Sequence, residues 1–357
     1  MTRMRAIVQD RYGAPDEVLH LREVEIPTPA ADEVLVRVRA ASVNPDVWHA
    51  VTGYPRVMRL MGAGLRRPKQ PIPGLDMAGE VTAVGNAVVD FQPGDAVFGE
   101  THDKIQWTNG GAYAEYVCVP QHVLAPKPGN ISFEQAGSVP TSGIIALVNL
   151  RKHLGRKPVQ RIVINGAAGN VGSIAIQMAK AKGAYVVGVD HSTKLDYMRE
   201  LGADEVMDYT REDVTRLDEP VDLIVDVAST LSLSDCKRIL EPDGLYIAIG
   251  HDHYGTKGRR TLGGFPHFLG LMARASFNRH LDRSWFEVIE KGDAMEILRG
   301  MLEAGQLTPI VGRTFPLEEA PAAIQCLQAG QACGRADCHR AVGLGTPISR
   351  WQLPEKR

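Results

Sequence analysis

The stretch from Arg161 to Asp190, RIVINGAAGNVGSIAIQMAKAKGAYVVGVD, constrains the fold of this chain more than any other part of the sequence. Its β-branched run at 162–164 is too short for a helix and is typical of a strand buried on both faces of a parallel sheet. A turn of small residues follows, then a segment with helical spacing, and then a second apolar run from Tyr185 to Val189. The helical segment has one apolar stripe, formed by Ile174, Met178 and Ala181. Strand, turn, helix and strand in this order predict a βαβ unit.

The turn of this unit has the spacing of a dinucleotide-binding motif. Alanine replaces the first glycine of G-x-G-x-x-G, and an extra glycine precedes it. Small residues let a pyrophosphate approach the backbone, and a helix beginning near Val171 would point its free N–H groups and positive dipole end at that charge. Asp190 ends the second strand, about where an acid contacts the adenosine ribose. The predicted cofactor-binding residues of the turn are Gly166, Ala167, Ala168, Gly169, Asn170, Val171 and Gly172.

Length and charge limit the remaining possibilities. A chain of 357 residues exceeds the usual size of one core, so we expect two domains. Forty basic and 42 acidic residues produce no strong field, which disfavours a nucleic-acid partner. The five cysteines are irregularly spaced and indicate reduced thiols. With no apolar signal segment and no apolar run long enough to span a membrane, a cytoplasmic protein is expected.

The first 125 residues are predicted to form a β-rich domain. Short alternating segments at 4–8, 19–24 and 33–40 are punctuated by glycine and proline, which is typical of strands. Further strands are expected within 74–85, 91–99 and 110–117. Between them lies a long irregular stretch, 54–73, with a basic RRPK sequence, and loops of this length are often lids.

A family resemblance covers almost the whole chain. The order of the 34–46 segment, GLDMAGEVTAVG, FQPGDAVFG, GGAYAEYV and the dinucleotide unit resembles the medium-chain dehydrogenase/reductase superfamily, specifically its zinc-free quinone oxidoreductase (zeta-crystallin-like) branch. The resemblance implies an α/β fold: a GroES-like β-rich catalytic domain at 1–125 and a Rossmann domain, with a doubly wound parallel sheet, at 126–308. Residues 309–357 would return to the first domain. Where the family ends in a G-K-V-V-I strand, this chain has GRADCHRAV and a polar tail.

The resemblance also bears on zinc. Zinc-dependent members place a cysteine and a G-H-E triplet where this chain has Asn44 and the sequence GLDMAGE at 74–80, and they carry a four-cysteine lobe that is missing here. A catalytic zinc needs three protein ligands, so we predict no metal. Three histidines without ligand-like spacing are interpreted as solvated or structural: His49, His102 and His122.

Without a metal, the substrate carbonyl must be polarised by hydrogen bonds. The resemblance places Asn44 in the cleft, where its amide would donate to a quinone or enone oxygen. Asp46, Tyr54 and Thr141 are further candidates for orienting substrate or nicotinamide. Asp46 is equally consistent with a helix cap, and Tyr54 with a packed loop aromatic. No dedicated proton donor is evident, so water would protonate the product.

The signals for cofactor choice conflict. By resemblance, Lys194 and Tyr209 stand where family members hold the 2′-phosphate of NADP(H), although Lys194 is also consistent with a solvated helix start. Asp190 favours the free ribose hydroxyl of NAD(H). Because the loop that contains Ser192 can redirect this carboxylate, NADP(H) is favoured over NAD(H). Gly250 is expected near the nicotinamide.

The sequence therefore predicts a zinc-independent, NADPH-dependent oxidoreductase of quinones or α,β-unsaturated carbonyls. An alcohol dehydrogenase and a non-catalytic dinucleotide sensor are the alternatives. The insertion at 251–280 is basic and apolar, and is interpreted as a lid, a dimer surface or, less favoured, a membrane-interface helix. A homodimer is expected.

Overall fold

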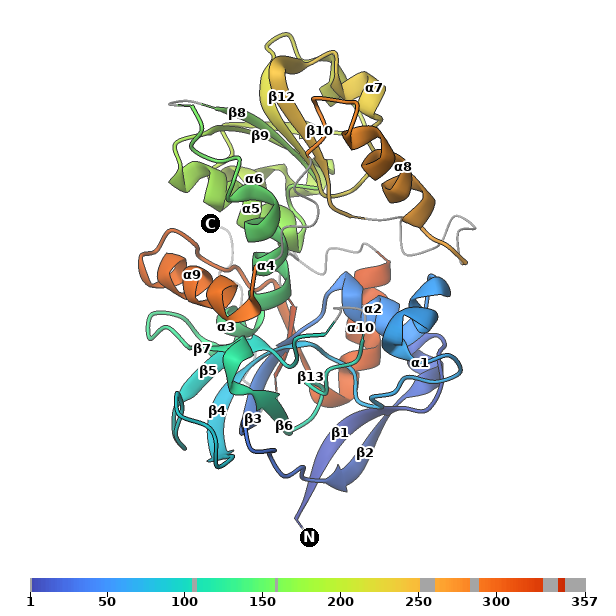
Figure 1. Ribbon diagram of the computed structural model, residues 1–357, viewed down its shortest axis with the longest axis vertical. Coiled ribbons are helices and arrows are strands. Elements are labelled where there is room, and N and C mark those ends of the chain that lie inside the picture. The colour runs from blue at the N-terminus through green and yellow to red at the C-terminus, as the bar shows by residue number, and fades with distance from the viewer. Residues whose placement is uncertain are drawn as a thin grey trace, which may run out of the picture.

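The computed structural model describes residues 2–104, 108–157, 160–250, 261–282, 289–329 and the backbone of 340–343. Two large sheets form its two ends, the parallel sheet at the top of Figure 1 and the antiparallel one at the bottom. Helices α4 (Pro140–Leu150) and α9 (Lys291–Glu303) lie between them and contact each other. This arrangement confirms the α/β class expected from the sequence.

The parallel sheet has the strand order β10-β9-β8-β11-β12. Its strands are β8 (Arg161–Asn165), β9 (Tyr185–Asp190), β10 (Glu205–Asp208), β11 (Val221–Asp226) and β12 (Leu240–Ala248). The chain leaves β8 toward β9 and β10 on one side and returns through β11 and β12 on the other. The strand order therefore reverses between β8 and β11, which is where ligands bind in doubly wound sheets.

Both faces of the parallel sheet are covered. Ile162 and Ile164 of β8 pack into one core with α4, α5 (Asn170–Ala181) and α9, whereas Val163 packs into a second core on the other face. This confirms the predicted doubly buried strand. The predicted helix stripe was wrong at one position: Ile174 and Met178 are buried, but Ala181 is exposed because α5 ends there. The shorter helices around this sheet are α6 (Leu195–Glu200), α7 (Leu233–Cys236) and α8 (Phe265–Ala275).

The second sheet has the order β13-β14-β3-β4-β5-β7, with β6 also paired to β3. Its strands are β3 (Glu33–Ser42), β4 (Asp76–Val84), β5 (Ala96–Glu100), β6 (Tyr116–Pro120), β7 (Leu124–Pro126), β13 (Arg313–Pro316) and β14 (Arg340–Gly343). A hairpin of β1 (Arg3–Gln9) and β2 (Leu19–Glu25) lies beside it. The strand expected at 110–117 begins later, at Tyr116, because Gly111 has φ +95° and forms a turn.

The last part of the chain completes the second sheet. Strand β14 pairs with β3 in antiparallel fashion and with β13 in parallel fashion, although its sequence differs from the family's closing strand. In the chain, α10 (Ala320–Gln328) lies between β13 and β14. It packs against α1 (Pro15–Val18) and α2 (Pro45–Thr52). Cys326 of α10 is disulfide-bonded, whereas Cys118 and Cys236 are free. The expectation of five reduced thiols was therefore wrong, because irregular spacing in sequence does not limit which cysteines meet in space.

Residues 251–260 of the predicted insertion lie outside the described residues, and its described part, 261–280, contacts both parts of the molecule. Leu271 and Ala275 of α8 are buried in the outer core of the parallel sheet. The Thr261 carbonyl accepts a hydrogen bond of 3.0 Å from the Val57 backbone, and Gly263 lies directly against Pro55. The stretch predicted to be irregular also contains a short turn, Arg59–Ala63, whose backbone is non-helical at Met61 and Gly62. Among the described helices, none has the length and apolar content that a membrane span requires.

Candidate active site

The glycine-rich turn lies at the carboxyl end of β8. Gly166 has φ +80°, which favours glycine, and a Cβ on Gly172 would come within 2.2 Å of the Gly166 carbonyl oxygen. Gly169 caps α5, which begins at Asn170, one residue before the expected start. The turn therefore points the first N–H groups of α5 out of the end of the sheet, as the binding of a pyrophosphate requires.

A pocket of about 480 Å³ adjoins this turn, at the point where the strand order reverses. Its walls come from the carboxyl ends of β8 to β11 and include Gly166, Asp190 and Tyr209. Gly250 follows β12 at the same edge and lies so close to the Val227 carbonyl that a Cβ would come within 2.0 Å of it. The residues present thus fit the dinucleotide that the turn predicts.

Asp190 does not point its carboxylate freely into this pocket. One oxygen, Oδ2, accepts from the Ala168 backbone at 3.1 Å, and Oδ1 accepts from the His191 backbone at 2.8 Å. Lys194 pairs with Oδ1 at 3.2 Å. Lys194 and Ser192 belong to the one-turn helix Ser192–Lys194, and Tyr209 is 59% exposed with its ring 6.0 Å from that of His191. Asp190 and Lys194, which indicate different cofactors in the sequence, therefore form an ion pair in the structure.

On the other side, Asn44 is the N-cap of α2. Its Oδ1 accepts from the Val47 backbone at 3.0 Å, and Pro45 occupies the first helical position. The interpretation of Asp46 as the cap was wrong, because Asn44 is the last extended residue and Asp46 lies buried in the first turn. Tyr54 is half-buried just past α2, where the Arg59 guanidinium lies 5.8 Å from its ring.

The amide group of Asn44 is only partly used. Ser42 Oγ and Asp76 Oδ2 each lie 3.1 Å from Asn44 Nδ2 and 2.5 Å from each other. They subtend roughly 50° at the nitrogen, well below the roughly 120° between the two hydrogens of a planar amide. One hydrogen is therefore shared between both acceptors, and the other has no acceptor within the described part of the chain.

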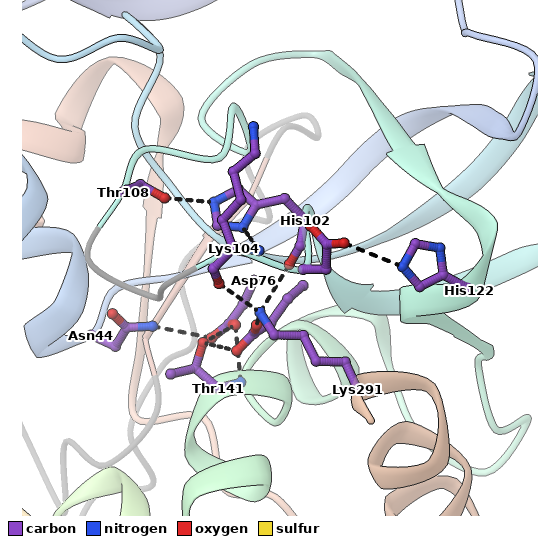
Figure 2. A network of polar contacts seen from close by, with 10 residues as sticks. Asn44, Asp76, His102, Lys104, Thr108, His122, Thr141 and Lys291 are labelled. Atoms are coloured by element: carbon purple, nitrogen blue, oxygen red, sulfur yellow. Dashed lines mark hydrogen bonds and ion pairs between the residues drawn. The ribbon is translucent and has the colours of Figure 1, made fainter. Parts of the chain in front are cut away.

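Asp76 and Thr141 join Asn44 to a buried polar network that the sequence did not predict (Figure 2). Thr141 donates its backbone N–H to Asp76 Oδ1 at 3.0 Å, and its hydroxyl lies 2.5 Å from the same oxygen and 2.9 Å from Glu100 Oε1. Lys291 of α9 binds Glu100 Oε2 and donates to the His102 carbonyl at 2.9 Å. Burial, together with the negative charge of Glu100, raises the pKa of Asp76 to about 7. The signal in the sequence is an acid at the start of one apolar strand, Asp76, and an acid at the end of the next, Glu100.

The described residues do not fit a catalytic zinc. No three His, Cys, Asp or Glu side chains within the described ranges are grouped so that they could hold a metal ion. Of the positions matched to zinc ligands by resemblance, Leu75 offers no donor atom. Asp76 is already engaged by Ser42, Asn44 and Thr141. A catalytic zinc needs three protein ligands, and this set does not supply them.

Comparison with known proteins agrees with this fold. Residues 30–129 match the alcohol dehydrogenase GroES-like domain, and residues 201–336 match the zinc-binding dehydrogenase model. The chain is 30% identical to a chloroplastic quinone oxidoreductase of Triphysaria versicolor, over 93% of this chain and 97% of the relative. It is also 30% identical to the chloroplastic NADPH-dependent alkenal/one oxidoreductase of Arabidopsis thaliana, over 93% of this chain and 78% of the relative.

A solved structure is similar over the same extent. The quinone oxidoreductase from Coxiella burnetii superposes with a TM-score of 0.75 at 26% identity, covering 96% of this chain and all of that one. The sheet order, the glycine-rich turn and the matched domains agree with these similarities. The chain belongs to the medium-chain dehydrogenase/reductase superfamily of oxidoreductases, in its quinone oxidoreductase (zeta-crystallin-like) branch.

Proposed function

We propose that this protein reduces quinones or α,β-unsaturated carbonyl compounds with NADPH, without a zinc ion. The observation that carries the proposal is the open N–H of Asn44, held in a buried site that also contains Thr141. A single fixed donor in a water-poor site stabilises negative charge on a substrate oxygen without a metal. The names of the two relatives, a quinone oxidoreductase and an alkenal/one oxidoreductase, support the same substrate classes.

The parallel sheet would bind the cofactor, which supplies the hydride when bound. The turn from Gly166 to Gly172 would hold the pyrophosphate, and Thr141 and Gly250 would lie toward the nicotinamide. Lys194, Ser192 and Tyr209 would contact the 2′-phosphate. NADPH is favoured because Asp190 is bonded to the turn and paired with Lys194, which reduces its repulsion of a phosphate.

Within the substrate side, Asn44 would donate to the oxygen that becomes negative, and Asp46 and Tyr54 would orient the substrate. The test is the oxidation of NADPH by chelator-treated protein supplied with a small quinone or enone. Asn44→Ala should lower kcat/KM by roughly 10²-fold or more while the dissociation constant for NADPH stays the same. Activity that disappears with the chelator and returns with zinc would show that the mechanism is wrong.

Two other functions make different predictions. An alcohol dehydrogenase would oxidise primary or secondary alcohols with NAD or NADP, and the match to the alcohol dehydrogenase GroES-like domain keeps this candidate. A sensor would bind NADPH tightly but would not oxidise it, whichever acceptor is supplied. Four points stay predictions: the domain limits, a homodimer, a cytoplasmic location and a role of 251–280 as a lid. The contact of Thr261 with Val57 supports the lid.

A further inference from the structure

Two buried acids lie directly opposite each other in the second sheet. Asp76 of β4 is the register partner of Glu100 of β5, and both residues are 0% exposed. Like charges at opposed positions of neighbouring strands repel, and in a water-free site the repulsion is far stronger than at the surface. Two ionised carboxylates in this arrangement need a compensating proton or cation.

The contacts of Thr141 fit one proton held between the two acids. Its hydroxyl lies 2.5 Å from Asp76 Oδ1 and 2.9 Å from Glu100 Oε1, both within hydrogen-bond distance. A threonine hydroxyl carries one hydrogen, and ionised carboxylates carry none. Each contact has a hydrogen of its own only if one of the two carboxyl groups supplies a second one. The alternative, one hydroxyl hydrogen shared between two ionised acids, leaves Asp76 ionised opposite Glu100 with no cation of its own among the described residues.

The surrounding charges decide which carboxyl group holds the proton. Lys291 of α9 binds Glu100 directly and also donates to the carbonyls of His102 and Lys104 in the loop after β5. Burial and the charge of Lys291 lower the pKa of the nearby His102 ring, so this ring is not a second cation for the pair. Within the described ranges no Lys, Arg or His side chain pairs with Asp76. Its hydrogen-bond partners are neutral: Ser42, Asn44 and Thr141, and the Tyr113 hydroxyl donates to the Ser42 carbonyl nearby. The charged group that faces it is Glu100, whose negative charge favours the protonated form of Asp76.

We infer that Asp76 carries the proton and donates it to Thr141, which in turn donates to the ionised Glu100 beside Lys291. Neutral Asp76 then positions Asn44 for substrate, and this role of Asp76 rests on the proposed function. Asp76 Oδ2 lies 3.1 Å from the Asn44 nitrogen that would bind the substrate oxygen. An ionised Asp76 would place a negative charge behind that donor and oppose the charge forming on the oxygen, whereas a neutral Asp76 does not.

The consequence is a one-proton dependence of the reaction on pH. As the pH rises through the pKa of Asp76, about 7, the proton is lost and kcat/KM should fall by about tenfold per pH unit. Asp76→Asn cannot ionise, so this alkaline fall should disappear whatever the variant's absolute rate. Thr141→Ser keeps the hydroxyl and should keep the alkaline fall. An Asp76→Asn variant with an unchanged alkaline fall would overturn the inference.

A second measurement needs no substitution in the site. In wild-type protein with ¹³C-labelled aspartate, infrared spectra at pH 6 should contain a carbonyl band of protonated aspartic acid that disappears with the same midpoint as the rate profile. This midpoint distinguishes it from a band of the buried Asp226, whose pKa is also raised by burial. Absence of that band at pH 6 would refute the protonated Asp76. A clear band in a protein that oxidises no NADPH would instead refute the proposed function and leave the proton assignment intact.

Discussion

Replacing Lys291 by Met should destabilise the protein strongly and in a pH-dependent way. Lys291 is 16% exposed and binds Glu100, which has no exposed surface, so the substitution leaves a buried carboxylate without its cation. Breaking one side of a buried ion pair costs roughly 3–5 kcal/mol. The penalty has an upper limit, because the carboxylate can take up a proton instead, and protonating an ordinary glutamate costs about 4 kcal/mol at pH 7 and about 1 kcal/mol at pH 5.

The loss of unfolding free energy in Lys291→Met should therefore be several-fold larger at pH 7 than at pH 5. Urea unfolding of wild type and variant at the two pH values measures this difference. Glu100→Gln in the Lys291→Met background should recover part of the loss at pH 7, because no buried charge remains. Lys157→Met is the matched control, since Lys157 is 49% exposed in its pair with Asp222 and should lose little at either pH. Equal losses for Lys291→Met at both pH values would refute the reasoning.

Two further predictions concern the cofactor. Lys194→Ala should raise the dissociation constant of NADPH by roughly 10- to 100-fold, the value of one charge-assisted hydrogen bond, and leave that of NADH almost unchanged. Tighter binding of NADH by wild type, with neither constant changed in the variant, would remove the case for NADPH. Gly172→Ala should weaken the binding of both NADPH and NADH at least tenfold, because its Cβ would meet the Gly166 carbonyl at 2.2 Å. Gly270→Ala is the control, since a Cβ there meets nothing within 4 Å, and it should change neither dissociation constant in a titration followed by fluorescence.

Much of the cofactor half of the molecule could be predicted from local sequence. The strand at 162–164, the turn and the helix after it follow from β-branched residues, small residues and helical spacing, which act between near neighbours. The predictions failed where a local rule left two choices. Asp46 and Asn44 are both good caps, and the one that ends the extended segment became the cap. Asp190 and Lys194 pointed to different cofactors until the structure placed them 3.2 Å apart.

The sequence by itself determined that this chain has a dinucleotide turn on a parallel sheet beside a β-rich unit, because those features are fixed by periodicity and turn chemistry over short distances. Only the tertiary structure decided that Asp76 faces Glu100, since that pairing depends on the register of β4 and β5. Lys291 reaches Glu100 from α9, far along the chain, and Thr141 enters from α4 between the two sheets. Charges that meet only through packing leave no pattern in the sequence, because the energy that holds them depends on burial and distance.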